Sequence, residues 1–237
     1  MANKKDNFWI PYADLMTVLM VVFLFISIAY MGLLQIDKNK KQKIFKDYKE
    51  TKESLYNDLN TEFRNDFIRW NLELDKDLSI KFTNPKVLFD DGKSDIKPEF
   101  QKILTSFFPK YLSIVLQNKY NDKIAEIRIE GHTNNIPIHE TVDPYIDNIK
   151  LSQDRSRNVL QFLRKLSYYK NLSLEKKQVL QFWITANGLS YGRTLDENNK
   201  LTYISKKSID NQKSRRVEFK IVTNSEVLVD EVIKNMK

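Results

Sequence analysis

The stretch "FWIPYADLMTVLMVVFLFISIAYMGLL", residues 8–34, contains a single charged side chain, that of Asp14. The 22 residues from Leu15 to Ile36 carry no charge, and a membrane-spanning helix needs about 20 apolar residues. A cleaved signal peptide has a shorter apolar core and ends in small residues, which this segment lacks. The sequence therefore predicts a retained transmembrane helix over residues 13–36, preceded by a short cytoplasmic segment, residues 1–12.

Lysines on the two sides of this helix bear on its orientation. Two of them, Lys4 and Lys5, precede it, and five follow it closely: Lys38, Lys40, Lys41, Lys43 and Lys46. Flanking lysines favour the cytoplasmic side of a membrane. Taken alone, these charges place the C-terminal bulk in the cytoplasm, which opposes the orientation that the C-terminal motifs imply.

The rest of the composition is that of a folded protein. The 237 residues are 41% hydrophobic and 12% aromatic, and only five glycines and six prolines are present. Cysteine is absent from the sequence, which excludes disulfides and thiolate metal sites but leaves the compartment open. The formal net charge of +8 does not by itself indicate a nucleic-acid partner, because lysine is abundant along the whole chain.

Asp14 has two interpretations. In one, its carboxylate lies among the lipid headgroups and complements the dipole at the start of the helix. In the other, it faces a partner helix and carries a proton or a cation, because a carboxylate within a membrane span costs roughly 3 kcal/mol and is usually functional. Thr17 lies one turn further on and can share the face of Asp14.

The block "YADLMT", residues 12–17, followed by a single apolar helix, resembles the stator B subunits of bacterial ion-driven motors. Within that group, the chain is more similar to the ZorB-like proteins of Zorya anti-phage systems than to flagellar MotB, whose leader is usually longer. The resemblance implies that Asp14 carries the ion, with Thr17 beside it. It also implies a MotA-like partner, as a pentamer around two copies of this chain, and no cofactor. The ion is expected to be H⁺, with Na⁺ left open.

Residues 37–77 are expected to form a helical linker. Apolar residues recur there at helical spacing, at Tyr48, Leu55, Leu59, Phe63, Phe67, Trp70 and Leu74. The favoured interpretation is a stripe that packs on its own domain or on a dimer mate. A helix lying on the membrane surface is the alternative. By resemblance, part of residues 36–52 is a candidate plug for the ion path.

From about residue 78 the pattern predicts an α+β sandwich with element order βαβαββ. Alternating or β-branched runs predict strands over residues 78–83, 124–133, 179–185 and 216–223. Amphipathic spacing predicts helices over residues 97–117 and 151–166, and Pro109 is expected to kink or split the first. Residues 224–237 are expected to be a C-terminal tail.

Five blocks over residues 78–223 resemble, in order, the C-terminal domain of OmpA-like proteins. They are "VLFDDGKSDIKP" (87–98), "IEGHTNNIP" (129–137), "NIKLSQDRSRNVLQFL" (148–163), "NGLSYGR" (187–193) and "SRRVEF" (214–219). The family binds peptidoglycan non-covalently through the diaminopimelate of the stem peptide. The resemblance therefore implies a periplasmic domain on a single-pass protein of the bacterial inner membrane.

The expected peptidoglycan-binding residues are Thr133, Asn134, Asn148, Leu151 and Arg155. Arg155 carries a planar fork of donors suited to a carboxylate, and the family's key arginine falls on its position. An ordinary surface ion pair is the alternative for this side chain. Asn134 stands where the family commonly has aspartate, so it can hydrogen-bond to the ligand but cannot pair with an ammonium. The expected strength of binding is therefore open.

Other functions fit the sequence less well. The Gly188-Leu-Ser190-Tyr-Gly192 run matches the serine hydrolase pattern, but no histidine follows residue 139 to complete a triad. A turn that needs two glycines is the better explanation, and no catalytic residue is expected. His132 and His139 lack the partners of a zinc site, so no metal site is expected. The basic residues around Arg215 are followed at once by Glu218, which argues against a nucleic-acid surface.

Two hypotheses of different class remain. The first is an ion-driven stator subunit anchored to peptidoglycan, in anti-phage defence or, as the second choice, in a flagellar motor. The second is a passive anchor that ties the membrane to the wall without ion flow. Substitution of Asp14 by Asn separates them, since only the motor depends on the carboxylate.

Overall fold

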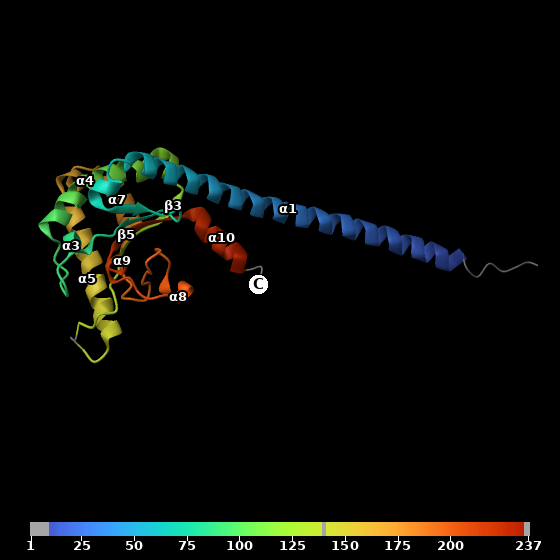
Figure 1. Ribbon diagram of the computed structural model, residues 1–237. Coiled ribbons are helices and arrows are strands. Elements are labelled where there is room, and N and C mark those ends of the chain that lie inside the picture. The colour runs from blue at the N-terminus through green and yellow to red at the C-terminus, as the bar shows by residue number, and fades with distance from the viewer. Residues whose placement is uncertain (1–9, 139–140, 235–237) are drawn as a thin grey trace, which may run out of the picture. The chain divides into compact units, whose positions relative to one another are not determined.

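The computed structural model of the protein describes residues 10–138 and 141–234 (Figure 1). The chain divides into two compact units, Met1–Asp47 and Tyr48–Lys237. His139, one of the two histidines considered above, lies outside the described residues.

Helix α1, Ile10–Glu62, contains the predicted membrane span. Its apolar side chains from Tyr12 to Ile36 are exposed, and it is the one described helix that is long and apolar enough to cross a membrane. The helix continues through the lysine-rich segment without interruption. The expectation of a linker helix reaching residue 77 is wrong, because α1 ends at Glu62 and a short helix α2, Phe67–Trp70, follows. Asn71 then takes a left-handed conformation, with φ 49°, which ends α2.

The apolar stripe of the linker packs on its own domain, as the favoured interpretation holds. The side chains of Leu55, Leu59 and Phe63 are fully buried in the core of the C-terminal unit. The ring of Phe63 stacks on that of Phe107 with a centroid separation of 5.1 Å. Phe107 belongs to helix α4, Pro98–Val115, so the last turns of α1 are part of this fold.

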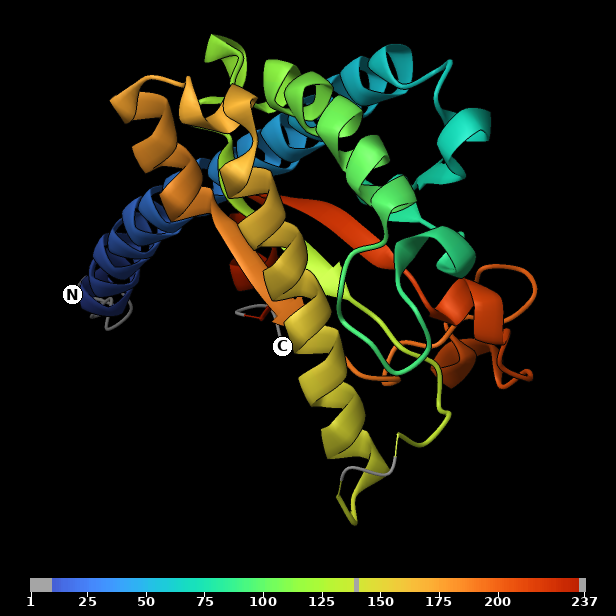
Figure 2. The same ribbon diagram turned by 90° about the vertical axis from the view of Figure 1, so that its left-hand side faces the viewer.

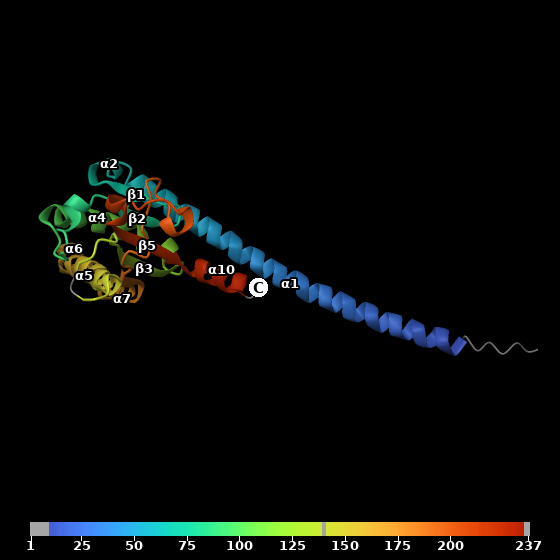
Figure 3. The same cartoon turned by 60° about the horizontal axis from the view of Figure 1, so that its bottom comes forward.

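A five-stranded sheet, in the order β1-β2-β5-β3-β4, forms the centre of the C-terminal unit. Figure 3 shows the first four strands side by side. The bounds are β1 Leu72–Leu74, β2 Ser79–Phe82, β3 Ile124–Gly131, β4 Ile184–Gly188 and β5 Val217–Thr223. The β3–β4 pair is parallel and the other pairs are antiparallel. Strand β1 was not predicted, because its three residues continue the helical spacing of the linker.

Helices α4 and α5, Pro144–Lys165, cover one face of the sheet, and α10, Asn224–Lys234, lies behind it in Figure 2. The aromatic rings of Phe82, Phe107 and Phe219 meet edge to face between α4 and the strands. The expected α+β sandwich with helices on the sheet is therefore confirmed. The remaining short helices are α3 Pro85–Leu88, the 3₁₀ helix η1 Asn118–Tyr120, α6 Ser167–Lys170, α7 Leu174–Trp183, α8 Thr202–Ser205 and α9 Asn211–Ser214.

Several predicted elements differ from the structure in extent or type. Residues 179–183, expected to begin a strand, form the end of α7, and the strand starts at Ile184. Leu180 and Trp183 are buried at helical spacing, so one face of α7 provides the apolar pattern that resembled a strand. Pro109 does not split α4, which is one helix. Part of the expected tail, residues 224–234, forms α10.

Candidate functional site

The five residues expected to bind peptidoglycan line one cavity of about 280 Å³. It lies beside the first turns of α5 and is bordered by the segment after β3 and by the turn that follows α3. The described lining residues are Asp91, Gly92, Thr133, Asn134, Ile136, Pro137, Ile138, Asn148, Leu151, Arg155 and Arg215. Sequence segments separated by more than a hundred residues therefore meet at a single site.

Arg155 is fixed in the wall of this cavity. Its side chain is buried, Nε donates to the Lys93 carbonyl (2.9 Å) and Nη2 donates to the Asp90 carbonyl (3.2 Å). The guanidinium also stacks over the ring of Phe89, 4.9 Å from its centroid. A guanidinium has five N–H groups, so three remain for a ligand. Burial, followed by the charge of Arg215, lowers the pKa of Arg155 to about 10, so the group stays charged at neutral pH.

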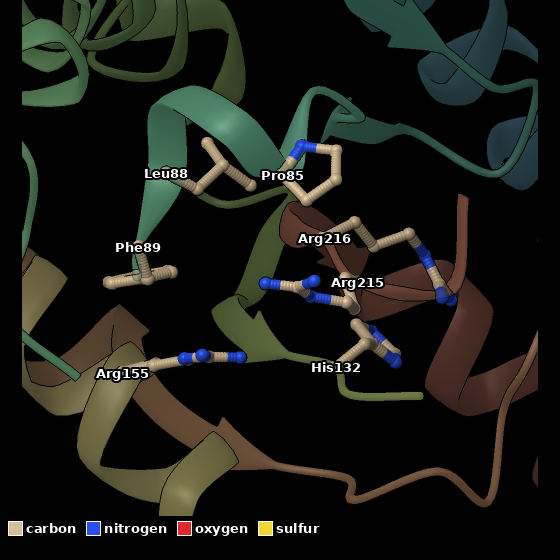
Figure 4. A pocket seen from close by; sticks show the side chains of 7 residues that line it. All are labelled: Pro85, Leu88, Phe89, His132, Arg155, Arg215 and Arg216. Atoms are coloured by element: carbon tan, nitrogen blue, oxygen red, sulfur yellow. The ribbon is translucent and has the colours of Figure 1, made fainter. Parts of the chain in front are cut away.

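Arg215 adds a second cation that the sequence analysis did not assign to this site. It directly follows α9, two residues before β5, and its Nη2 forms an ion pair with the carboxylate of Asp91. In Figure 4 the guanidinium groups of Arg155 and Arg215 extend toward one another from opposite sides of a smaller adjoining pocket. The two cations and one carboxylate give the described walls of the site a net positive charge.

Thr133 and Asn134 follow the end of β3 and present polar groups to the cavity. The backbone N–H of Thr133 donates to the Ser190 carbonyl (3.0 Å), which holds the segment in place. Its hydroxyl is buried and has no partner among the described residues. The Oδ1 atom of Asn134 accepts a hydrogen bond from the Ile136 N–H (3.4 Å). An unsatisfied hydroxyl in a cavity wall is a natural donor or acceptor for a bound ligand.

Asn148 and Leu151 take different parts in the same wall. The Nδ2 group of Asn148 donates to the carbonyls of Ile136 (3.2 Å) and Pro144 (3.0 Å), so it ties the cavity loop to the start of α5. Asn148 is buried, and this geometry makes it a positioning residue. Leu151 is partly exposed and supplies an apolar surface one turn later. Asp143 caps the helix by accepting from the Tyr145 N–H (2.9 Å), which places α5 earlier than its predicted start at 151.

Two neighbours of Arg155 on α5 lie outside the cavity. Arg157 is exposed and forms an ion pair with Asp154 (2.8 Å), as its spacing from Arg155 predicts. Ser152 does not cap a helix. It lies inside α5, donates to the Ile149 carbonyl (2.9 Å) and accepts from the Ser190 N–H (3.0 Å).

A group of buried charged residues adjoins the site, since His132 and Arg216 line the smaller pocket together with Arg155 and Arg215. His132 lies 3.6 Å from the Glu130 carboxylate and 3.5 Å from that of Glu218, and neither ring nitrogen has a hydrogen bond among the described residues. The ring of His132 therefore lies between two carboxylates. Burial, followed by the charge of Arg216, lowers the pKa of His132. Burial opposes ionisation of Glu218, but the charges of His132 and Arg216 outweigh it and lower its pKa to about 2.

The residues Glu130, His132 and Glu218 are also the described group whose ligand atoms, all within 4.8 Å of one another, can approach a metal ion. Both oxygens of Glu218 are engaged, one by Arg216 and the other by the Ser79 hydroxyl (2.9 Å). A guanidinium in contact with a ligand carboxylate opposes a second cation there. We therefore assign this cluster to an internal ion-pair network.

The serine hydrolase pattern has a structural explanation. Ser190 is fully buried, and its hydroxyl donates to the Tyr145 carbonyl (3.0 Å). The expected turn is present, since the Gly192 N–H donates to the Leu189 carbonyl (3.2 Å). Its positive φ, 49°, is taken by Ser190 and by neither of the two glycines. Gly188 instead ends β4 where the backbone of α5 passes close to it.

Asp14 and Thr17 lie in the N-terminal unit on α1. The Thr17 hydroxyl donates to the Ala13 carbonyl (2.8 Å), so its oxygen keeps a lone pair for another donor. Asp14 and Thr17 are three residues apart and share a helix face. No described residue of this single chain forms a hydrogen bond or an ion pair with the Asp14 carboxylate, which leaves it exposed on the helix surface.

Comparisons with known proteins identify similar sequences and structures. Residues 88–202 match the OmpA family. The chain is 37% identical to Zorya protein ZorB from the Crooks strain of Escherichia coli, over 98% of this chain and 94% of that protein. A Zorya protein ZorB from a second Escherichia coli strain is 26% identical, over 95% and 92%. Among solved structures, a MotB-like protein from Desulfovibrio vulgaris is 21% identical with a TM-score of 0.47, over 74% of this chain and 96% of that one. The periplasmic domain of Helicobacter pylori MotB is 14% identical with a TM-score of 0.42, over 67% and 85%.

Proposed function

This chain belongs to the family of Zorya protein ZorB, and on that premise we propose that it is the wall-anchored B subunit of an ion-driven motor in anti-phage defence. Its role is non-enzymatic. The C-terminal unit binds the stem peptide of peptidoglycan, and the membrane helix carries protons through an interface with a MotA-like partner. The ring of that partner then rotates around copies of this chain, which the wall holds in place.

The observation that carries the anchoring role is the cavity that holds Arg155. A stem peptide offers carboxylates and amide groups, and the fixed fork of Arg155 matches a carboxylate with two parallel hydrogen bonds. Thr133 and Asn134 supply hydroxyl and amide groups for the peptide, and Leu151 supplies an apolar contact. Because Arg155 is already held by Asp90 and Lys93, little side-chain entropy is lost when the ligand binds.

The motor role rests on Asp14. A carboxylate at the head of an apolar helix favours its neutral form once a partner removes it from water. A proton that binds there from one compartment and leaves to the other gains about 2.3 kcal/mol for each 100 mV of membrane potential. Two copies of the chain inside a pentameric partner ring are the assembly that the family resemblance implies.

The wall-binding role determines the orientation of the chain. Peptidoglycan lies outside the inner membrane, so the cavity of this chain that binds it must be periplasmic. The segment before α1 must then be cytoplasmic. The five lysines that follow the span, Lys38 to Lys46, run against the positive-inside rule in this orientation. We give the ligand site more weight, because flanking charges bias insertion whereas a wall anchor on the wrong side has no ligand.

The test is a pair of substitutions in cells that carry the complete defence system. Asp14→Asn is expected to abolish protection in a plaque assay while sedimentation of the protein with purified cell walls is unchanged. Arg155→Gln is expected to abolish both. Asp37→Asn, on the same helix but beyond the apolar run, and Arg157→Gln, on a different, exposed face of α5 and paired with Asp154, are the matched controls.

The outcomes also separate the alternatives. If Asp14→Asn protects as well as the natural chain while Arg155→Gln fails, the protein is a passive anchor. If the gene restores swimming to a strain without a flagellar B subunit, the flagellar alternative replaces defence. If both variants protect and sediment normally, neither half of the proposal survives.

A further inference from the structure

Arg215 and Asp91 extend the candidate site beyond the residues that the sequence motifs indicate. We propose that Arg155 and Arg215 form a two-arginine clamp for one carboxylate of the ligand, and that this carboxylate displaces Asp91 from Arg215. The inference rests on the proposed function, because it assigns the ligand's carboxylate to the wall stem peptide. It adds a second binding residue and an internal competitor to that site.

The first argument is the charge arrangement. Arg155 and Arg215 line both the main cavity and the smaller pocket beside it, and their guanidinium groups extend toward one another (Figure 4). Two like charges on facing walls of one cavity repel each other. The charge of Arg215 contributes to the lowered pKa of Arg155, whereas Asp91 acts in the opposite direction. An anion placed between the two cations attracts both and offsets this repulsion.

The second argument is that one turn holds both arginines. Residues 90–93 form a tight turn in which the Lys93 N–H donates to the Asp90 carbonyl (3.1 Å) and Gly92 has a φ of 67°. The carbonyls at both ends of this turn accept from Arg155, and the side chain of Asp91 within it pairs with Arg215. A shift of this turn therefore moves the hydrogen-bond acceptors of Arg155 and the ion-pair partner of Arg215 together.

The third argument is the ease of exchange. The Asp91 side chain is 88% exposed, whereas that of Arg215 is 23% exposed. An ion pair with so exposed a carboxylate contributes little to stability, because water screens it. A ligand carboxylate that also contacts the fixed fork of Arg155 gains hydrogen bonds that Asp91 does not make. The ligand is thus expected to win the competition for Arg215.

The test is calorimetric titration of the full-length protein in detergent with the tripeptide L-Ala-γ-D-Glu-meso-diaminopimelate. Arg215→Gln is expected to raise the dissociation constant about tenfold. That is the effect of losing one charge-assisted hydrogen bond at a site that is partly open to water. Asp91→Asn is expected to strengthen binding several-fold, since it removes the competitor. In the double variant the gain from Asp91→Asn disappears, because its target is gone. The same tripeptide with its diaminopimelate carboxylates amidated is expected to bind weakly and to be insensitive to Arg215→Gln.

The results distinguish this inference from the function on which it rests. If the natural chain does not bind the tripeptide, or if Arg155→Gln binds it normally, the wall-binding function itself fails. If Arg155→Gln abolishes binding while Arg215→Gln and Asp91→Asn leave the dissociation constant within twofold, only the clamp is overturned. Arg215→Lys keeps the charge but loses the fork, and should recover part of the affinity. Unchanged melting temperatures for the variants at the Asp91–Arg215 pair exclude a loss of fold as the cause.

Discussion

Gly131 and Gly188 are paired directly across the parallel strands β3 and β4, and the backbone of α5 passes over both. A Cβ atom on Gly131 would lie 2.3 Å from the Ser152 carbonyl oxygen, and one on Gly188 would lie 2.3 Å from the Gln153 nitrogen. Only glycine permits so close an approach of helix and sheet. Ser152 and Gln153 lie in α5 just before Arg155. This contact therefore determines the distance between Arg155 and the strands.

Gly188→Ala is therefore expected to destabilise the C-terminal unit and to weaken its binding to cell walls. The added methyl group meets backbone atoms, which cannot rotate away, so α5 must shift at a cost of about 2 kcal/mol or more. Thermal melting of the purified protein and sedimentation with purified walls measure the two effects. Gly192→Ala is the matched control, because its Cβ would lie 3.4 Å from the Tyr145 hydroxyl. Equal melting temperatures for the two variants would contradict the close-packing argument.

Strands and helices were predictable wherever the sequence shows one clear hydrophobic period. Strand β2 and strand β5 follow the alternation and β-branched composition that the sequence shows, and α4 follows its amphipathic spacing in spite of Pro109. Residues 179–183 were misassigned because a short apolar run has no clear period. The capping side chain of Ser173, which accepts from the Lys176 N–H (3.3 Å), was the local signal for a helix there.

Leu59→Ala is expected to destabilise the C-terminal unit although Leu59 lies on α1. Its side chain is fully buried in the same core as the sheet, and truncation of such a leucine costs about 2–5 kcal/mol. Chemical denaturation followed by tryptophan fluorescence measures the loss. Asn57→Ala, at an exposed position on the same helix, is the control and should be neutral. If Leu59→Ala is equally neutral, the end of α1 is a linker and not part of the domain.

The stability of the C-terminal unit is expected to fall as the solution becomes acidic. The pKa of buried His132 is lowered from its ordinary value of 6.5, so below that pH the unfolded chain binds a proton that the folded chain does not. This contribution to the free energy of unfolding is therefore greatest above pH 6.5. It declines as the pH falls toward the pKa that His132 has in the folded chain. Glu218, with a pKa lowered from 4.5 to about 2, adds a second loss between those two values, because its ion pairs hold only while it is charged.

Urea denaturation at about pH 7.5 and at about pH 5.5 checks the histidine contribution, since only His132 of these two groups titrates in that window. The free energy of unfolding should be lower at the acidic pH. His132→Gln, which cannot take up a proton, should reduce this difference while lowering stability at both pH values. A variant with the same pH dependence as the natural chain would show that His132 is not responsible.

The motif residues of the candidate site were predictable from the sequence, but the two further charged residues in its wall were not. Thr133, Asn134, Asn148, Leu151 and Arg155 fall on a known pattern, and the structure gathers them. Arg215 and Asp91 are 124 residues apart, and their ion pair depends on how β5 and the turn after α3 meet. Both stood within blocks that resemble the family, but no spacing in the sequence connects them.

Asn134→Asp is expected to change which form of the stem peptide binds. Asp keeps the oxygen that accepts from the Ile136 N–H, so the loop geometry is retained, while a carboxylate enters a cavity walled by Arg155 and Arg215. A stem peptide with a free ammonium should then bind about tenfold more tightly, because a charge-assisted hydrogen bond replaces a neutral one. The same peptide with its amine acetylated should gain nothing.

Calorimetric titration of the two peptides into Asn134→Asp and into the natural chain measures this preference. Asn135→Asp is the matched control, since it adds the same charge at the next, exposed position. The new carboxylate can also pair with the two arginines, and in that case the affinity for both peptides falls together. A preference for the free amine shows that residue 134 faces the ammonium end of the ligand. A parallel loss shows instead that it faces the carboxylate end, beside Arg155 and Arg215.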